Sequence, residues 1–175
     1  MSKSIKVLSV LIYLFLLGCS NHKINVEDQN NQAVAKLISL GLEAEKSERG
    51  VIIYLPPEIN FEESKSDIDL KARGKIAEIS SELNKRYLLN RSIEVSGHAN
   101  SNGESEVNME ISKNRAQAVA EELVFSNVLL SRLIITWHGE EKPRFPEFDA
   151  QGKRIQENLD MNRRVQLIVL NPDEN

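Results

Sequence analysis

The amino-acid sequence predicts an α+β fold, a two-layer sandwich in which a mixed β-sheet is covered by two long helices. Apolar side chains recur at helical spacing over residues 72–86 and again over residues 111–123. Short runs rich in β-forming residues surround these two stretches, namely residues 42–46, 51–55, 93–95, 133–137 and 165–170. The 175 residues contain no internal repeat, and they suffice for one domain with extensions.

The first 18 residues have the pattern of a secretion signal. Lys3 and Lys6 precede an apolar run from Val7 to Leu17, which as a helix spans only about 16 Å, roughly half of a bilayer core. A signal peptide therefore explains the run better than a transmembrane anchor. The run ends in Leu-Leu-Gly-Cys, which resembles the bacterial lipobox, so we expect cleavage before Cys19 and lipid on its sulfur. Ser20 at the next position implies sorting to the outer membrane.

Two segments with different predicted structures are expected between the signal peptide and the domain. Residues 19–31 are polar and Asn-rich, which predicts a lipidated N-terminus followed by a flexible tether, or else a disordered end without a role. Residues 32–50 predict a short helix and the first strand of a hairpin, with Gly50 at a positive-φ position. The domain itself is expected over residues 51–171, and residues 172–175 form a polar tail.

Two further signals concern the first long helix and the overall charge. Ser66 and Asp69 predict a capping box at the start of the helix. The net charge of −4 argues against a nucleic-acid partner, whose phosphates need a basic surface. One cysteine cannot form an internal disulfide, and no set of His, Cys, Asp and Glu has metal-ligand spacing. We therefore expect no metal, no cofactor and no catalytic residues.

The sequence is organised around residues 92–124. A strand is followed by a polar loop between Gly97 and Gly103, and then by an amphipathic helix. Arg115 is expected in the first turns of that helix, close to a hydroxyl group and several amides. A guanidinium over exposed backbone N–H groups at a helix start makes a pocket for an anion, most plausibly a carboxylate.

These residues also resemble a known family. The motifs that carry the resemblance are Gly97-His98-Ala99-Asn100, Gly103, Asn108, Ser112, Arg115-Ala116, Val119, Gly139 with Pro143, and Asn162-Arg163-Arg164-Val165. In this order and spacing they are similar to the OmpA C-terminal-like domain, the peptidoglycan-binding module of several envelope proteins. The resemblance covers roughly residues 51–170, and Phe61 with Ile68 adds to it.

The resemblance implies a function and a set of site residues. It implies a clamp for the zwitterionic end of diaminopimelate in a peptidoglycan stem peptide. Arg115 would hold the carboxylate bidentately, through two guanidinium N–H groups. Asn108 would fix the loop or contact the peptide, and Arg163 would line the rim. His98 belongs to the same motif, although the residues alone favour a ring that packs at the base of the loop.

One position departs from the family pattern. Asn100 stands where the family has an aspartate that takes the ammonium group of the ligand. Its carbonyl oxygen still accepts a hydrogen bond, but the charge is lost, which corresponds to roughly 1–2 kcal/mol, or about tenfold in affinity. We therefore expect weakened peptidoglycan binding or a shifted preference within the stem peptide.

Three hypotheses follow from the sequence. In the first, the protein is an outer-membrane lipoprotein that binds peptidoglycan non-covalently and tethers the envelope layers. In the second, it is a protein-interaction module of an envelope secretion, motility or signalling complex, with little wall binding. The third and least favoured is an envelope enzyme. Asn100 separates the first two, since it bears directly on wall affinity.

Overall fold

The structure, a computed structural model, describes residues 25–56, 59 and 68–172 of the chain. The predicted signal peptide, Cys19 with its expected lipid, and Phe61 lie outside the described residues. Within those residues, no helix is both long enough and apolar enough to cross a membrane.

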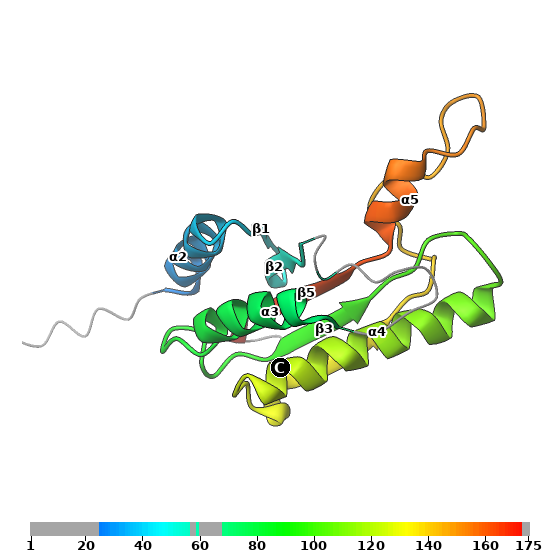
Figure 1. Cartoon of the computed structure of the whole chain (residues 1–175). Coiled ribbons are helices and arrows are strands. Elements are labelled where there is room, and N and C mark those ends of the chain that lie inside the picture. The colour runs from blue at the N-terminus through cyan, green and yellow to red at the C-terminus, as the bar shows by residue number, and fades with distance from the viewer. Residues whose placement is uncertain (1–24, 57–58, 60–67, 173–175) are drawn as a thin grey trace, which may run out of the picture.

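A five-stranded mixed sheet forms one layer of the fold (Figure 1). The strands lie in the order β1-β2-β5-β3-β4, and only β3 and β4 pair in parallel. Their bounds are β1 Glu43–Ser47, β2 Gly50–Tyr54, β3 Ile93–Gly97, β4 Leu133–Trp137 and β5 Val165–Leu170. The predicted strands, the hairpin and the mixed sheet are confirmed.

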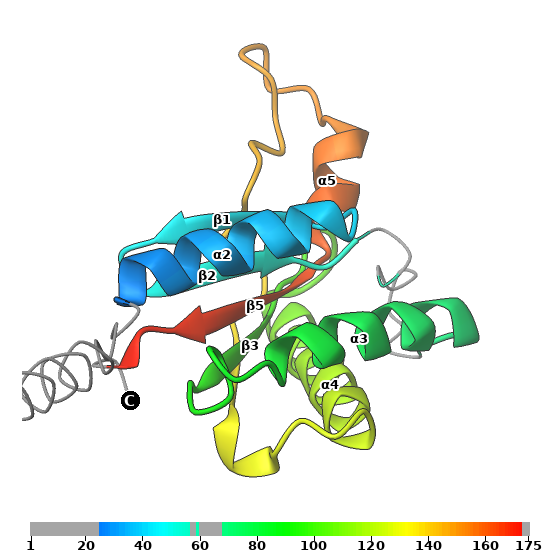
Figure 2. The ribbon, with the colours of Figure 1, turned by 90° about the vertical axis from the view of Figure 1, so that its left-hand side faces the viewer.

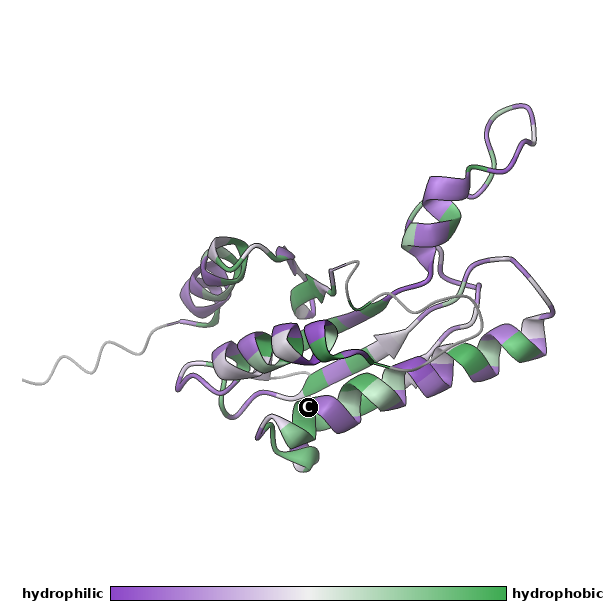
Figure 3. Ribbon diagram, in the orientation of Figure 1, coloured by the Kyte–Doolittle hydropathy of each residue, from purple (hydrophilic) through white to green (hydrophobic). Residues whose placement is uncertain are grey.

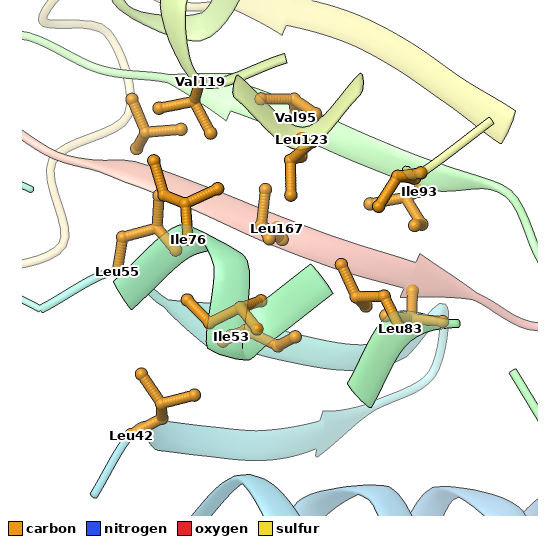
Figure 4. Packing of buried hydrophobic residues seen from close by; sticks show 14 of the residues in the cluster. Leu42, Ile53, Leu55, Ile76, Leu83, Ile93, Val95, Val119, Leu123 and Leu167 are labelled. Atoms are coloured by element: carbon orange, nitrogen blue, oxygen red, sulfur yellow. The ribbon is translucent and has the colours of Figure 1, made fainter. Parts of the chain in front are cut away.

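Helices form the second layer, and the two predicted long helices are joined there by the predicted shorter helix near the start of the described chain. They are α2 (Val26–Ser39), α3 (Leu70–Leu83) and α4 (Ser105–Phe125). Figure 2 shows α2 beside β1 and β2, with α3 and α4 next to each other. Ala33 and Leu37 of α2 belong to the same buried cluster as the inward side chains of α3, α4 and the sheet. Figure 4 shows part of this cluster, with Ile76 of α3 and Leu123 of α4 facing the strands.

Helix α2 begins earlier than the sequence analysis expected. The side chain of Asn25 accepts a hydrogen bond from the backbone N–H of Asp28 at 2.9 Å, so it caps the helix. The side chain of Asn30 then donates to Asn171 at 3.1 Å and accepts from Arg91 at 2.7 Å. Residues 26–31 are thus helical and held against the end of β5, and the prediction of a flexible tether is wrong for them.

The start of α3 differs in a similar way. Asp69 is the N-cap residue, and its carboxylate accepts a hydrogen bond from the backbone N–H of Ala72 at 2.7 Å. Ser66, the other residue of the predicted capping box, lies outside the described residues. Gly50 does have the predicted positive φ, at 141°, and a Cβ there would lie 2.0 Å from the carbonyl oxygen of Val169.

The end of β3 packs against the backbone of α4 at Gly97. A Cβ built on Gly97 would lie 2.0 Å from the carbonyl oxygen of Ser112. Only a residue without a side chain allows this approach. The contact fixes where the chain leaves the sheet and enters the polar loop.

We predict that Gly97→Ala destabilises the fold by about 1–3 kcal/mol, because strand and helix must separate to admit a methyl group. Gly74→Ala is the matched control. Gly74 lies in α3, nothing lies within 4 Å of a Cβ there, and alanine in a helix is worth about 0.5–1 kcal/mol more than glycine. Urea unfolding of both variants measures the difference, and equal stability of the two would contradict this packing.

Candidate ligand-binding pocket

The loop after β3 is fixed on two sides. The backbone N–H of Ala99 donates to the carbonyl of Gly139 at 2.7 Å, and the N–H of Gly139 donates to the hydroxyl of Ser112 at 3.0 Å. The polar loop from Gly97 to Gly103 is therefore tied to α4 and to the chain that follows β4. These bonds position the walls of a small pocket.

The pocket has a volume of about 110 Å³. It is lined by Ala99, Asn100, Asn102, Gly103, Val107, Asn108, Ile111, Arg115 and Arg163. Four of the five candidate binding residues thus lie around one cavity, although the chain separates Asn100 from Arg163 by 63 positions. His98 is the exception and does not line it.

Arg115 lies deeper in α4 than the sequence analysis expected. The helix begins at Ser105, so Arg115 is almost three turns in, and the exposed N–H groups of the helix start are not beside it. Its side chain is 1% exposed. Burial lowers the pKa of Arg115 to about 10, and the positive charge of Arg163 acts in the same direction. Arg115 is still charged at neutral pH, and an anion in the pocket would stabilise that charge.

Two further donors in the pocket have no hydrogen bond of ordinary geometry within the described chain. They are the side-chain amide nitrogen of Asn108 and the Nε of Arg163, and both atoms are buried. Arg163 also forms an ion pair through Nη1 with Asp160 at 2.9 Å. Buried donors are normally paired, because an unpaired one costs about 1–3 kcal/mol. The pocket is therefore built to receive an acceptor, and its cations favour a negatively charged one.

Both the nitrogen and the oxygen of the Asn100 side-chain amide form hydrogen bonds. Its Nδ2 donates to the carbonyl of Leu159 at 3.1 Å, and its Oδ1 accepts from the backbone N–H of Asn102 at 3.2 Å. The residue is 3% exposed. Asn100 therefore ties the loop to α5 (Gln156–Asn162), a structural role that an aspartate could not fill in the same way, since it has no N–H to donate.

The segment between β4 and β5 forms the outer wall. It contains α5, and the hairpin that precedes α5 projects from the body of the protein in both views (Figures 1 and 2). The hairpin and helix are mostly hydrophilic (Figure 3). The buried side chain of Asn162 holds the base of the hairpin by accepting from the backbone N–H groups of Arg144 and Phe145 at 2.9 and 3.0 Å.

Glu147 is a buried residue near the pocket loop that was not among the predicted site residues, and it is 8% exposed. Its carboxylate accepts hydrogen bonds from the backbone N–H of Ser101 at 3.0 Å and from the side chain of Asn162 at 2.9 Å. No local pattern distinguishes Glu147 from the other charged residues of its segment. Its contact with Ser101 joins positions that are 46 residues apart.

His98 packs beneath the loop, as its surroundings in the sequence suggested. It is 2% exposed, its ring centroid lies 5.1 Å from that of His138, and its Nε2 lies 3.3 Å from the hydroxyl of Ser96. Burial lowers the pKa of His98 to about 3, and the positive charges of Arg164 and Lys142 contribute. The ring is therefore neutral near pH 7. The described residues contain no group of three or more His, Cys, Asp and Glu arranged to hold a metal ion.

The fold and the pocket define a class of protein, an α+β binding domain with a small cationic pocket between a loop, a helix and the chain before the last strand. The profile of the OmpA family matches residues 60–156 of this chain, which is more than half of its length. The chain belongs to the OmpA family.

Two relatives show how far this similarity reaches. A peptidoglycan-associated lipoprotein of Mesorhizobium japonicum is 29% identical over 139 residues, covering 78% of both proteins. The photosystem I P700 chlorophyll a apoprotein A2 of Gloeobacter violaceus is 28% identical over 120 residues. That match covers 69% of this chain, which spans only 14% of the photosystem protein.

Solved structures share the fold at lower sequence identity. The cell wall anchor of the T6SS from Pseudomonas aeruginosa superposes with a TM-score of 0.63 at 19% identity, over 79% of this chain and 94% of the anchor. The periplasmic domain of Helicobacter pylori MotB also gives a TM-score of 0.63, at 23% identity, over 75% of this chain and 83% of that domain.

We predict that Asn100→Asp destabilises the protein by about 1–3 kcal/mol, because a carboxylate oxygen would replace the donor that faces the carbonyl of Leu159. Asn102→Asp is the control, since the side chain of Asn102 uses its oxygen to accept from Arg154. Thermal unfolding at pH 7 measures both variants. A gain in stability for Asn100→Asp would show that the amide does not hold α5.

The neutral His98 also predicts a dependence of stability on pH. Its pKa is about 3 when folded and about 6.5 when unfolded, so the unfolded state binds the extra proton as the pH falls below 6.5. The free energy of unfolding should decrease by on the order of 2 kcal/mol between pH 7 and pH 5 through this residue alone. His98→Asn should flatten the profile measured by urea unfolding. An unchanged slope would contradict a neutral His98.

Proposed function

We propose that this protein is an outer-membrane lipoprotein whose periplasmic domain binds the stem peptide of peptidoglycan non-covalently and so tethers the envelope layers. One observation carries the proposal. The guanidinium of Arg115 and the buried side-chain N–H groups of Asn108 and Arg163 belong to residues that line the same small pocket. The family and the similarity to a peptidoglycan-associated lipoprotein support the choice of ligand.

The chemistry of the pocket suits the carboxylate of diaminopimelate. A volume of about 110 Å³ admits a small group such as a carboxylate. Arg115 would hold it through two parallel N–H···O bonds, and Arg163 with Asn108 would supply further donors. Holding a ligand by charge and hydrogen bonds needs no catalytic group, so we assign a binding function and not an enzymatic one.

The arrangement of the ends of the domain fits attachment between a membrane and the wall. Helix α2 starts near Asn171, at the far end of β5, whereas the pocket loop follows the opposite end of the neighbouring strand β3. The 14-residue helix is about 21 Å long, so the described chain enters the domain roughly that far from the pocket end. A lipid on Cys19 would then leave the pocket facing away from the membrane.

A protein-interaction module is the second candidate, and a surface groove favours it. An open groove of about 570 Å³ lies along α4 beside Trp137, which is 40% exposed. Met109 and Lys113 also line it, and the Nζ of Lys113 lies 5.5 Å from the centre of the Trp137 ring. An exposed Trp beside a Met is typical of a protein contact. The neutral Asn100 also favours this second candidate, because it is expected to bind the ammonium group of the stem peptide more weakly than the family's aspartate does.

We predict that Arg115→Ala reduces binding to purified peptidoglycan sacculi by about ten- to a hundredfold, because charge-assisted hydrogen bonds are worth about 1.5–3 kcal/mol. Arg115→Lys keeps the charge but not the planar fork, so it should retain part of the affinity. Arg86→Ala removes an exposed arginine from the turn after α3 and is the matched control. Cosedimentation measures binding, and circular dichroism checks that each variant is folded.

The contradicting outcome is a folded Arg115→Ala variant that sediments with sacculi as well as the parent does. Recovery of a stoichiometric envelope protein, with little wall in the pellet, would favour the second candidate.

A further inference from the structure

We propose that Glu147 supplies the negative charge that binds the ammonium group of the ligand, in place of the carboxylate that Asn100 lacks. The inference rests on the proposed function, since it concerns the same pocket. It specifies the ligand as the zwitterionic end of an amino acid, with its carboxylate toward Arg115 and its ammonium toward Glu147.

Glu147 is buried without a counter-ion in the described part of the chain. Its carboxylate accepts from the backbone N–H of Ser101 through both oxygens, at 3.0 and 3.3 Å, and from the amide of Asn162 at 2.9 Å. Each of these donors is neutral. In the described part of the chain, no Lys, Arg or His forms an ion pair with Glu147. A buried carboxylate is unfavourable unless a cation pairs with it, and a ligand ammonium would do so.

The carboxylate of Glu147 is hydrogen-bonded to the pocket loop. Ser101, to which it is bonded, lies between Asn100 and Asn102, and both of these line the pocket. The two oxygens of a carboxylate offer about four acceptor sites, so one remains after the three bonds above. The Oδ1 of Asn100 likewise accepts only one bond, from the N–H of Asn102. Each of these two side chains therefore keeps an acceptor site for an ammonium group.

The charged residues that line the pocket are all positive. The lining of the pocket contains two guanidinium groups, Arg115 and Arg163, and no carboxylate. Asp160 is already paired with Arg163 at 2.9 Å, and its side chain is 49% exposed. Glu147 is thus the buried carboxylate that is hydrogen-bonded to the pocket loop. Arg115 and Glu147 thus offer opposite charges, as recognition of a zwitterion requires.

The experiment compares two peptides, L-Ala-D-Glu-diaminopimelate and the same peptide with 2-aminopimelate, which lacks only the distal amino group. Calorimetry measures both dissociation constants for the parent chain and for Glu147→Gln. Glutamine keeps the size of the side chain and an acceptor for Ser101. We expect Glu147→Gln to weaken binding of the first peptide about tenfold and that of the second less than twofold. Glu157→Gln, an exposed carboxylate on α5, should change neither constant appreciably.

The ratio of the two dissociation constants shows whether Glu147 acts through its charge on the ligand or only by holding the loop in place. If Glu147 only fastens the loop, both peptides lose affinity equally, and the inference is overturned while the proposed function stands. The same holds if the parent chain binds both peptides equally well. If the parent chain binds neither peptide, the proposed function itself fails. A selective loss for the diaminopimelate peptide supports the assignment even when Glu147→Gln lowers stability, because a misfolded fraction would weaken both peptides alike.

Discussion

The structure depends on the contact between the end of β3 and the backbone of α4. Gly97 lets strand and helix approach until a Cβ would lie 2.0 Å from a carbonyl oxygen of the helix. From there the polar loop must run over the helix, and Ser112 and Gly139 fix its path through the hydroxyl and the backbone N–H. The pocket is the space left between the loop and α4, so its shape follows from backbone packing more than from flexible side chains.

A pocket formed in this way can bury charge at a tolerable cost. Arg115 is almost completely buried, and burial lowers its pKa. Buried N–H groups of Asn108 and Arg163 belong to the same pocket. The site is thus held ready for a ligand, since the groups that would bind it are already desolvated and positioned.

Much of the fold follows from local patterns in the sequence. The apolar stripes of α3 and α4, the β-rich runs and the positive φ of Gly50 are all visible locally, and they are confirmed. The errors concern helix starts, since Asn25 and Asp69 act as caps through single side-chain bonds that compete with other polar residues nearby. Part of the pocket was also predictable, because Asn100, Asn108 and Arg115 lie in one motif. The bonds from Asn100 to Leu159 and from Glu147 to Ser101 cross 59 and 46 residues, so only the three-dimensional arrangement reveals them.

The central claim is that the buried guanidinium of Arg115 holds a carboxylate of the wall. A titration of the isotopically labelled protein with the diaminopimelate tripeptide, followed by NMR of the arginine Nε–H and asparagine side-chain signals, tests it most directly. The account predicts saturable shifts of the Arg115 and Asn108 signals at one common dissociation constant. Shifts confined to the surface beside Trp137, with the signals of Arg115 and Asn108 unmoved, would contradict it.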